Sequence, residues 1–221
     1  MPKSHRPCKE KSKGGAISAR SSSQTLGASV GMEMKKQSER VYQLKISLNG
    51  VKPPIWRRVL VPADTDLANL HTIIQISMGW TDSHLHQFIV GQKAYREPDP
   101  DFEDDSYPEA GVRIGSLLKK EKQWLTYEYD FGDDWEHRVT LEKALSKQEG
   151  EPLPKCIAGK RSTPPEDVGG IYGYAQFLRA YEDETHPEHE EYLEWAGDHF
   201  QPEQCDIEEI NEILLQTFTR A

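Results

Sequence analysis

The segment WLTYEYDFGDDWEHRVTL, residues 124–141, predicts a β-hairpin around which the other elements can be placed. Trp124 to Tyr129 is predicted as the first strand, and Asp130 to Asp134 as a turn in which Gly132 takes a positive φ. The returning strand places four side chains on one face: Trp135, His137, Val139 and Leu141. The hairpin tip therefore gathers carboxylates, aromatic rings and a histidine, which marks it as a candidate site.

The carboxylates at this tip allow three kinds of chemistry. Asp130, Asp133 and Asp134 could orient His137, bind a cation or act as an acid–base pair. His137 also lies among apolar neighbours on its strand face, where a histidine is often a hydrogen-bonded core residue. Both interpretations stay open, with His137, Asp130 and Asp133 as candidate catalytic residues.

An early helix is predicted by apolar side chains that recur at helical spacing from Leu67 to Met78. Asp64 or Thr65 is expected to cap its first turn, and Gly79 is expected to end it. The pattern favours a helix that faces the core. His71 is placed near its solvated flank and is assigned no role.

A strand from His84 to Val90 follows, with His84 and His86 on the same face. Histidines at this spacing have Cβ atoms about 7 Å apart, so both imidazoles could bind one metal ion. Asp133 at the hairpin tip is the third candidate metal ligand. The alternative is a pair of hydrogen-bonded histidines with no metal.

Two further segments are rich in carboxylates. Residues 97–109 hold seven acidic side chains without the glycine of an EF-hand, which favours a solvated loop. A linker from about Lys143 leads to residues 156–174, where Glu166 and Asp167 stand beside two glycines. This second loop is structural or donates carboxylates, so Glu166 and Asp167 complete the candidate catalytic residues.

The fold class follows from the order of these elements. Alternating runs at 42–48 and 55–61 predict a hairpin before the early helix, and helical patterns occupy the chain after about residue 170. We expect an α+β fold with a mixed, mostly antiparallel sheet, the early core helix packed on it, and a C-terminal helical section.

Charge separates the chain into two regions. Residues 1–40 hold nine basic and three acidic side chains, whereas the whole chain has 27 basic and 37 acidic ones. We therefore expect a disordered basic leader at 1–40 and a single acidic domain at 41–221. Translation from Met32 or Met34 would remove most of this leader. The acidic body disfavours nucleic acid, and only residues 1–40 are candidates for weak, non-specific contact with it.

No apolar run approaches the roughly 18 residues of a membrane span, so no membrane contact is expected. The three cysteines are odd in number and follow no secretory pattern, which favours the cytoplasm.

The order of four motifs resembles the plasmid pRiA4b ORF-3-like family, whose members also carry labels such as transposon passenger or TnpR. The motifs are PPIWRR at 53–58, MGW at 78–80 with HLHQF at 84–88, the segment 129–137, and PPED at 164–167 with Gly169-Gly170. The resemblance implies an α+β domain of unassigned activity, encoded on plasmids or other mobile elements. Many relatives place cysteines beside the PPED motif, where this chain has Thr163 and Val168.

Two classes of function remain. The first is a non-catalytic binding or accessory module, and the second is a metal-assisted, hydrolase-like enzyme that uses the His/carboxylate cluster. No cofactor, substrate or oligomeric state is indicated. The two classes differ in geometry, because the enzyme requires the face of His84 and His86 to meet the Asp130–His137 turn within about 5 Å.

Overall fold

The computed structural model describes residues 40–98, 105–197 and 200–219. The predicted leader, residues 1–40, lies outside the described residues except for Arg40. The acidic loop predicted at residues 97–109 is described only in part, because residues 99–104 are also outside.

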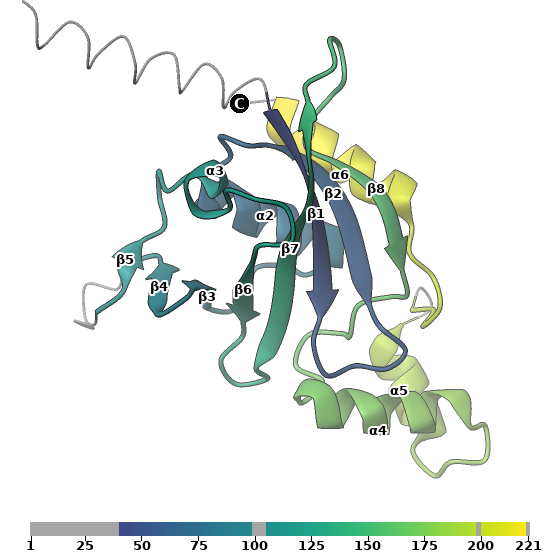
Figure 1. Ribbon diagram of the computed structural model, residues 1–221. Helices are drawn as coiled ribbons and strands as arrows, with labels where there is room; N and C mark the ends of the chain where they lie inside the picture. Colours follow the sequence, from purple (N-terminus) through teal and green to yellow (C-terminus); the bar gives the residue numbers. More distant parts are fainter. Residues whose placement is uncertain (1–39, 99–104, 198–199, 220–221) are drawn as a thin grey trace, which may run out of the picture.

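An eight-stranded sheet forms the centre of the molecule, in the order β5-β4-β3-β6-β7-β1-β2-β8 (Figure 1). All neighbouring strands are antiparallel except β4 and β5. The strands are β1 (Arg40–Leu48), β2 (Trp56–Pro62), β3 (His86–Val90), β4 (Lys93–Arg96), β5 (Tyr107–Pro108), β6 (Trp124–Tyr129), β7 (Trp135–Ser146) and β8 (Lys155–Lys160). The predicted α+β class, with a mixed and mostly antiparallel sheet, is confirmed.

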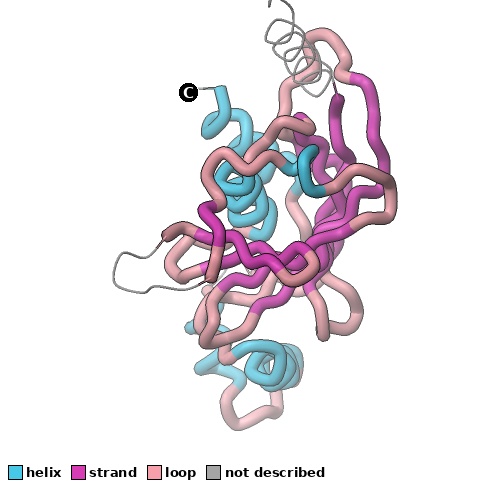
Figure 2. The backbone as a smooth tube through the Cα atoms, turned by 60° about the vertical axis from the view of Figure 1, so that its left-hand side comes forward, coloured by secondary structure: helices cyan, strands magenta, loops and turns pink. Residues whose placement is uncertain are grey.

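Five described helices complete the fold: α2 (Leu67–Met78), α3 (Ile114–Leu117), α4 (Gly170–Glu182), α5 (His189–Ala196) and α6 (Ile207–Thr219). Helices α2 and α6 lie on the same side of the sheet, while α4 and α5 pack beyond one end of the central strands (Figures 1 and 2). None of the described helices is both long and apolar enough to cross a bilayer.

The early core helix is confirmed as α2, with one correction at its start. The N-cap is Asp66 rather than Asp64 or Thr65, because its carboxylate accepts a hydrogen bond from the backbone N–H of Asn69 at 2.9 Å. Gly79 ends the helix in the left-handed conformation, as predicted, with φ 83°. The apolar stripe of α2 is buried against the sheet.

The hairpin of β6 and β7 is also confirmed, and pairs Tyr127 with His137. The predicted positive φ at Gly132 is wrong, because the left-handed positions are Asp130 (φ 57°) and Asp134 (φ 56°). Aspartate tolerates this conformation when its side chain bonds the nearby backbone. Here Asp130 Oδ1 accepts from the N–H of Gly132 at 2.9 Å, so the aspartate shapes the turn.

The linker predicted after about Lys143 is wrong in extent. β7 continues to Ser146, and β8 then pairs with β2, matching Cys156 with Val59. This pairing satisfies backbone groups of β2 that would otherwise form a sheet edge. The predicted loop at 156–174 therefore begins only after β8, and its remaining part, up to α4, carries Glu166 and Asp167.

Phe88→Ala tests whether the side chains of β3 and β6 that face the same way, Phe88 and Tyr127, belong to the core. The Phe88 ring is fully buried, and its centroid lies 5.0 Å from that of Tyr127. Removing it should lower the free energy of unfolding by about 3–5 kcal/mol in urea denaturation followed by circular dichroism. The matched variant Phe131→Ala removes a ring that is 44% exposed and should cost less than about 1 kcal/mol. Equal unfolding midpoints for both variants would contradict this core.

Candidate functional site

A cleft of about 740 Å³ opens where α2 faces the start of β3 and the tip of the β6–β7 hairpin. Its lining combines histidines, carboxylates and exposed apolar side chains, among them His71, Asp82, His84, Leu85, His86 and Phe131. The lining residues come from five separate segments, so the site exists only when the sheet has formed.

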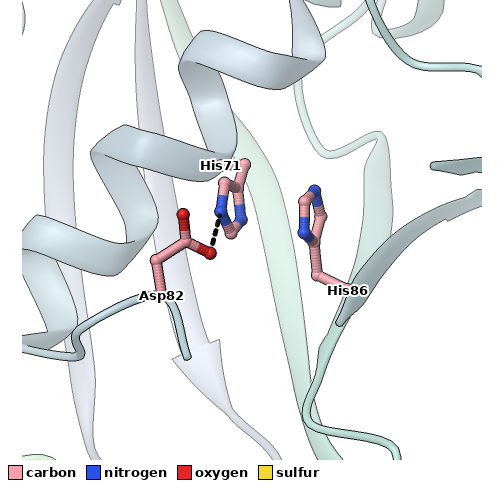
Figure 3. A group of neighbouring side chains, drawn as sticks. All are labelled: His71, Asp82 and His86. Carbon is pink, nitrogen blue, oxygen red and sulfur yellow. Dashed lines mark hydrogen bonds and ion pairs between the residues drawn. The ribbon is translucent and has the colours of Figure 1, made fainter. Parts of the chain in front are cut away.

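His71 and His86 stack face to face on one wall of this cleft (Figure 3). Their ring centroids lie 3.5 Å apart, and the planes differ by 7°. His71 is contributed by α2 and His86 by the first residue of β3. The earlier placement of His71 at a solvated flank is wrong, because it is only 6% exposed and lies in this wall.

Both ring nitrogens of His71 are hydrogen-bonded. Nδ1 lies 2.8 Å from the Tyr127 hydroxyl, and Nε2 lies 2.8 Å from Asp82 Oδ1. The Asp82 carboxylate can only accept, so Nε2 of His71 carries the proton; in the neutral ring Nδ1 then accepts from the Tyr127 hydroxyl, which itself accepts from the amide of Gln75 at 2.8 Å. His71 is therefore the tautomer that donates from Nε2 to Asp82. Burial lowers the pKa of His71, with the nearby His86 acting in the same direction.

His86 is held by a carboxylate of its own. Its Nε2 lies 2.9 Å from Oε2 of Glu109, which is 6% exposed. The solvated loop predicted for residues 97–109 is thus wrong at Glu109, because the backbone beside β5 brings this side chain into the wall. A carboxylate is buried at such a position only when a partner satisfies it.

The stacked pair does not have the geometry of a metal site, although His71, Asp82 and His86 bring ligand atoms within 4.8 Å of one another. A metal ion lies in the plane of each imidazole that binds it, about 2.0–2.1 Å from the nitrogen. With parallel rings 3.5 Å apart, an ion in one plane is far outside the other. This wall is therefore arranged for hydrogen bonding rather than chelation.

His84 belongs to a second group, with Asp130 and Asp167. His84 Nε2 lies 3.7 Å from Asp130 Oδ2 and 3.3 Å from Asp167 Oδ1. Asp130 of the hairpin turn therefore lies within 5 Å of His84, which is the separation that the enzyme requires. His86 does not join this group, so the two histidines that were candidates to bind one metal ion face different partners.

Asp133 and Glu166 lie outside this group and hydrogen-bond to neighbouring segments. Asp133 Oδ2 accepts from the backbone N–H of Gly169 at 3.1 Å, which ties the hairpin turn to the loop before α4. Glu166 accepts from the Tyr129 hydroxyl at 2.5 Å and bonds Thr81 through its other oxygen. Burial and Glu166 raise the pKa of Tyr129 well above its ordinary value. Both acids therefore hold two segments together in this structure.

His137 lies in the core, away from the cleft lining. It is fully buried, bonds the carbonyl of Trp135 through Nδ1 at 3.0 Å, and has ring contacts with Trp80 and Tyr127. Its Nε2 has no hydrogen-bond partner among the described residues. Burial lowers the pKa of His137 from 6.5 to about 4. Of the two interpretations of His137, this geometry is that of the core residue.

The sequence interpretation missed three side chains that hydrogen-bond in the cleft wall: His71, Asp82 and Glu109. A signal for His71 was present, because His71 and Gln75 follow Leu67 and Leu70 on the helical stripe that is buried in α2. Asp82 and Glu109 lie in irregular segments, where no periodicity indicates the direction of a side chain.

His137 should make folding sensitive to acid. Because its pKa is about 4 when folded and near 6.5 when unfolded, the unfolded chain binds the additional proton between these values. The contribution of neutral His137 to the free energy of unfolding is fully present above pH 6.5. It is lost as the pH falls towards 4, and the total loss is about 3 kcal/mol. Urea unfolding across this range should show a shallower pH dependence for His137→Phe. The variant His186→Gln, of a partly exposed histidine, is the control, and an unchanged slope in His137→Phe would assign the effect to other groups.

Comparison with known proteins places this geometry in a family. The model for plasmid pRiA4b ORF-3-like proteins matches residues 40–209. The uncharacterized protein y4hQ of Sinorhizobium fredii is 37% identical over 158 residues, which span 71% of this chain and 81% of that protein. The crystal structure of a protein of unknown function, MM3350 from Methanosarcina mazei Go1, superposes with a TM-score of 0.71 at 36% identity, covering 79% of this chain and 98% of that one. The resemblance noted in the sequence is confirmed, and the chain belongs to the plasmid pRiA4b ORF-3-like family.

Proposed function

We propose that the protein is a binding module that takes up a small ligand in the cleft between α2 and β3. The observation that carries this proposal is the stacked pair of His71 and His86, each fixed by a carboxylate from a different segment. A pocket whose polar groups are already held in position loses little conformational entropy when a ligand binds.

The hydrogen bonds in this wall favour recognition over proton transfer. Both nitrogens of His71 are already engaged, so neither is available to a substrate without exchange of partners. Asp133 and Glu166 are likewise bound to Gly169 and Tyr129. These groups therefore hold the site in position, and their hydrogen bonds are not available for acid–base catalysis without an exchange of partners.

The rim of the cleft suggests a ligand with an apolar part. Leu85 is 70% exposed and Phe131 is 44% exposed, and both line the cleft beside the polar wall. Side chains of this kind usually contribute the burial energy of a pocket, while a few polar groups fix orientation. We expect the ligand to place its polar end against the Asp82 and Glu109 side.

The family description refers to a plasmid reading frame, and we extend that setting to this chain. In this proposal the module serves a plasmid or other mobile element as an accessory protein in the cytoplasm. Its acidic body is not proposed to contact nucleic acid, because like charges repel the phosphate backbone.

A metal-assisted, hydrolase-like enzyme is the second candidate. The specific observation in its favour is the group of His84, Asp130 and Asp167, whose ligand atoms lie within 4.8 Å of one another. His84 also lines the cleft. A metal-bound water at such a site would supply the nucleophile that the hydrogen-bonded histidines do not. Turnover of a substrate separates this candidate from the binding module.

Thermal melting of the full chain against a panel of nucleotides, amino acids, sugar phosphates and short acyl compounds tests the binding proposal. At least one compound should raise the melting temperature, and Leu85→Ala or Phe131→Ala should weaken its binding about tenfold because apolar contact is lost. Ile213→Ala, an exposed residue of α6, should bind like the wild type.

Two results would contradict the binding proposal. No stabilisation by any compound would remove its basis, and equal loss of binding in the Ile213→Ala control would place the ligand elsewhere. Hydrolysis of p-nitrophenyl phosphate or acetate by the wild type, lost in Asp130→Asn, would favour the enzyme instead.

A further inference from the structure

We propose that His84, Asp130 and Asp167 form a binding site for one divalent transition-metal ion beside the hairpin end of the cleft, whose lining includes His84. These ligands differ from the candidates that the sequence offered, which were His84, His86 and Asp133. The inference goes beyond the proposed uptake of a ligand and does not depend on it, because metal binding can be measured directly.

The fold brings the three side chains together from separate segments. His84 lies two residues before β3, and Asp130 follows β6 directly, where its backbone N–H donates to the carbonyl of Leu85 at 2.9 Å. Asp167 lies in the loop before α4, and the contact between Asp133 and Gly169 fixes that loop against the turn. The ligand positions are thus set by backbone contacts around the site.

The distances suit one shared ion. His84 Nε2 lies 3.3 Å from Asp167 Oδ1 and 3.7 Å from Asp130 Oδ2. Two ligand atoms that each lie about 2.1 Å from an ion, at a near-tetrahedral angle, are separated by about 3.4 Å. The present separations are too long for strong hydrogen bonds and close to those of a coordination sphere.

His84 Nε2 provides an independent observation. This atom is buried from solvent, yet it has no hydrogen-bond partner among the described residues. Buried polar atoms are nearly always partnered, and an exception calls for an explanation such as an ion. A metal ion between the two carboxylates would coordinate this nitrogen.

The two carboxylates have complementary roles. Asp130 uses Oδ1 to accept from the N–H groups of Gly132 at 2.9 Å and Asp133 at 3.3 Å, which leaves Oδ2 directed towards His84. Such hydrogen bonds behind a ligand orient it for a metal. The Asp167 side chain is 74% exposed, so an ion can enter from its side.

The donor set indicates the class of metal. One imidazole and two carboxylates suit Zn²⁺, Mn²⁺ or Fe²⁺, whereas Mg²⁺ and Ca²⁺ prefer oxygen ligands alone. Three protein ligands also leave at least one coordination position for water or a ligand in the cleft, as in catalytic rather than structural zinc sites.

Isothermal titration of the full chain, without a histidine tag, with Zn²⁺ and with Mn²⁺ tests the site. The wild type should bind one ion. Asp167→Asn should weaken binding at least about tenfold, and His84→Ala about a hundredfold, because each removes a direct ligand. The visible absorption of bound Co²⁺ should change in the same variants, which reports the loss of the ligand itself.

Two control variants distinguish this site from its surroundings. Asp134→Asn alters the same turn at a residue outside the ligand set, and His186→Gln removes a partly exposed histidine outside it, so both should bind the ion like the wild type. Because Asp167 is largely exposed, its substitution should leave folding intact, which circular dichroism verifies. Absence of binding in the wild type, retention in His84→Ala, or loss in His186→Gln would each overturn the proposal.

Discussion

The contact between the Asp130–Asp134 turn and the loop before α4 is the constraint on which the site depends. Asp133 accepts from Gly169, and the carbonyl of Asp133 lies where a side chain on Gly170 would clash, 2.6 Å from an added Cβ. Gly170 also has φ 66°, so a residue with a side chain is excluded there for two reasons. This close approach places Asp167 beside His84 and lets Glu166 reach Tyr129. The candidate site is therefore a product of long-range packing between β6–β7 and the region before α4.

Two groups of side chains, one in the cleft wall and one beside it, differ in how their buried polar atoms are satisfied. Around His71 a chain of hydrogen bonds runs from Gln75 through Tyr127 to Asp82, and each member satisfies the next. A fully satisfied network of this kind is rigid and specifies one arrangement of the core. Around His84 the ring nitrogen makes no hydrogen bond among the described residues, and it faces one carboxylate oxygen at 3.3 Å and another at 3.7 Å. The first group gives the cleft a fixed wall, and the second leaves a position for an additional atom.

Patterns within single elements predicted the fold better than they predicted the site. The periodicity of α2, the hairpin of β1 and β2, and the hairpin of β6 and β7 follow from alternation or helical spacing, and the structure confirms them. The pairing of β8 with β2 was missed because residues 155–160 have little alternation of their own, and their partner lies about a hundred residues earlier. Glu109 and Asp82 were missed for a related reason, since their side-chain directions are set by contacts between distant segments.

The side chains of His84 and His86 point to different partners, which alternation along a strand did not predict. Alternation places residues i and i+2 on one face only within a regular strand, and β3 begins at His86. Pairing of His86 with Tyr129 fixes the direction of His86 towards α2, where it stacks on His71. His84 precedes the strand, so its direction is not bound by the pleat, and it turns towards Asp130 and Asp167. The two histidines whose spacing allowed one shared ion are thus separated: His86 belongs to a stacked pair, and His84 faces two carboxylates.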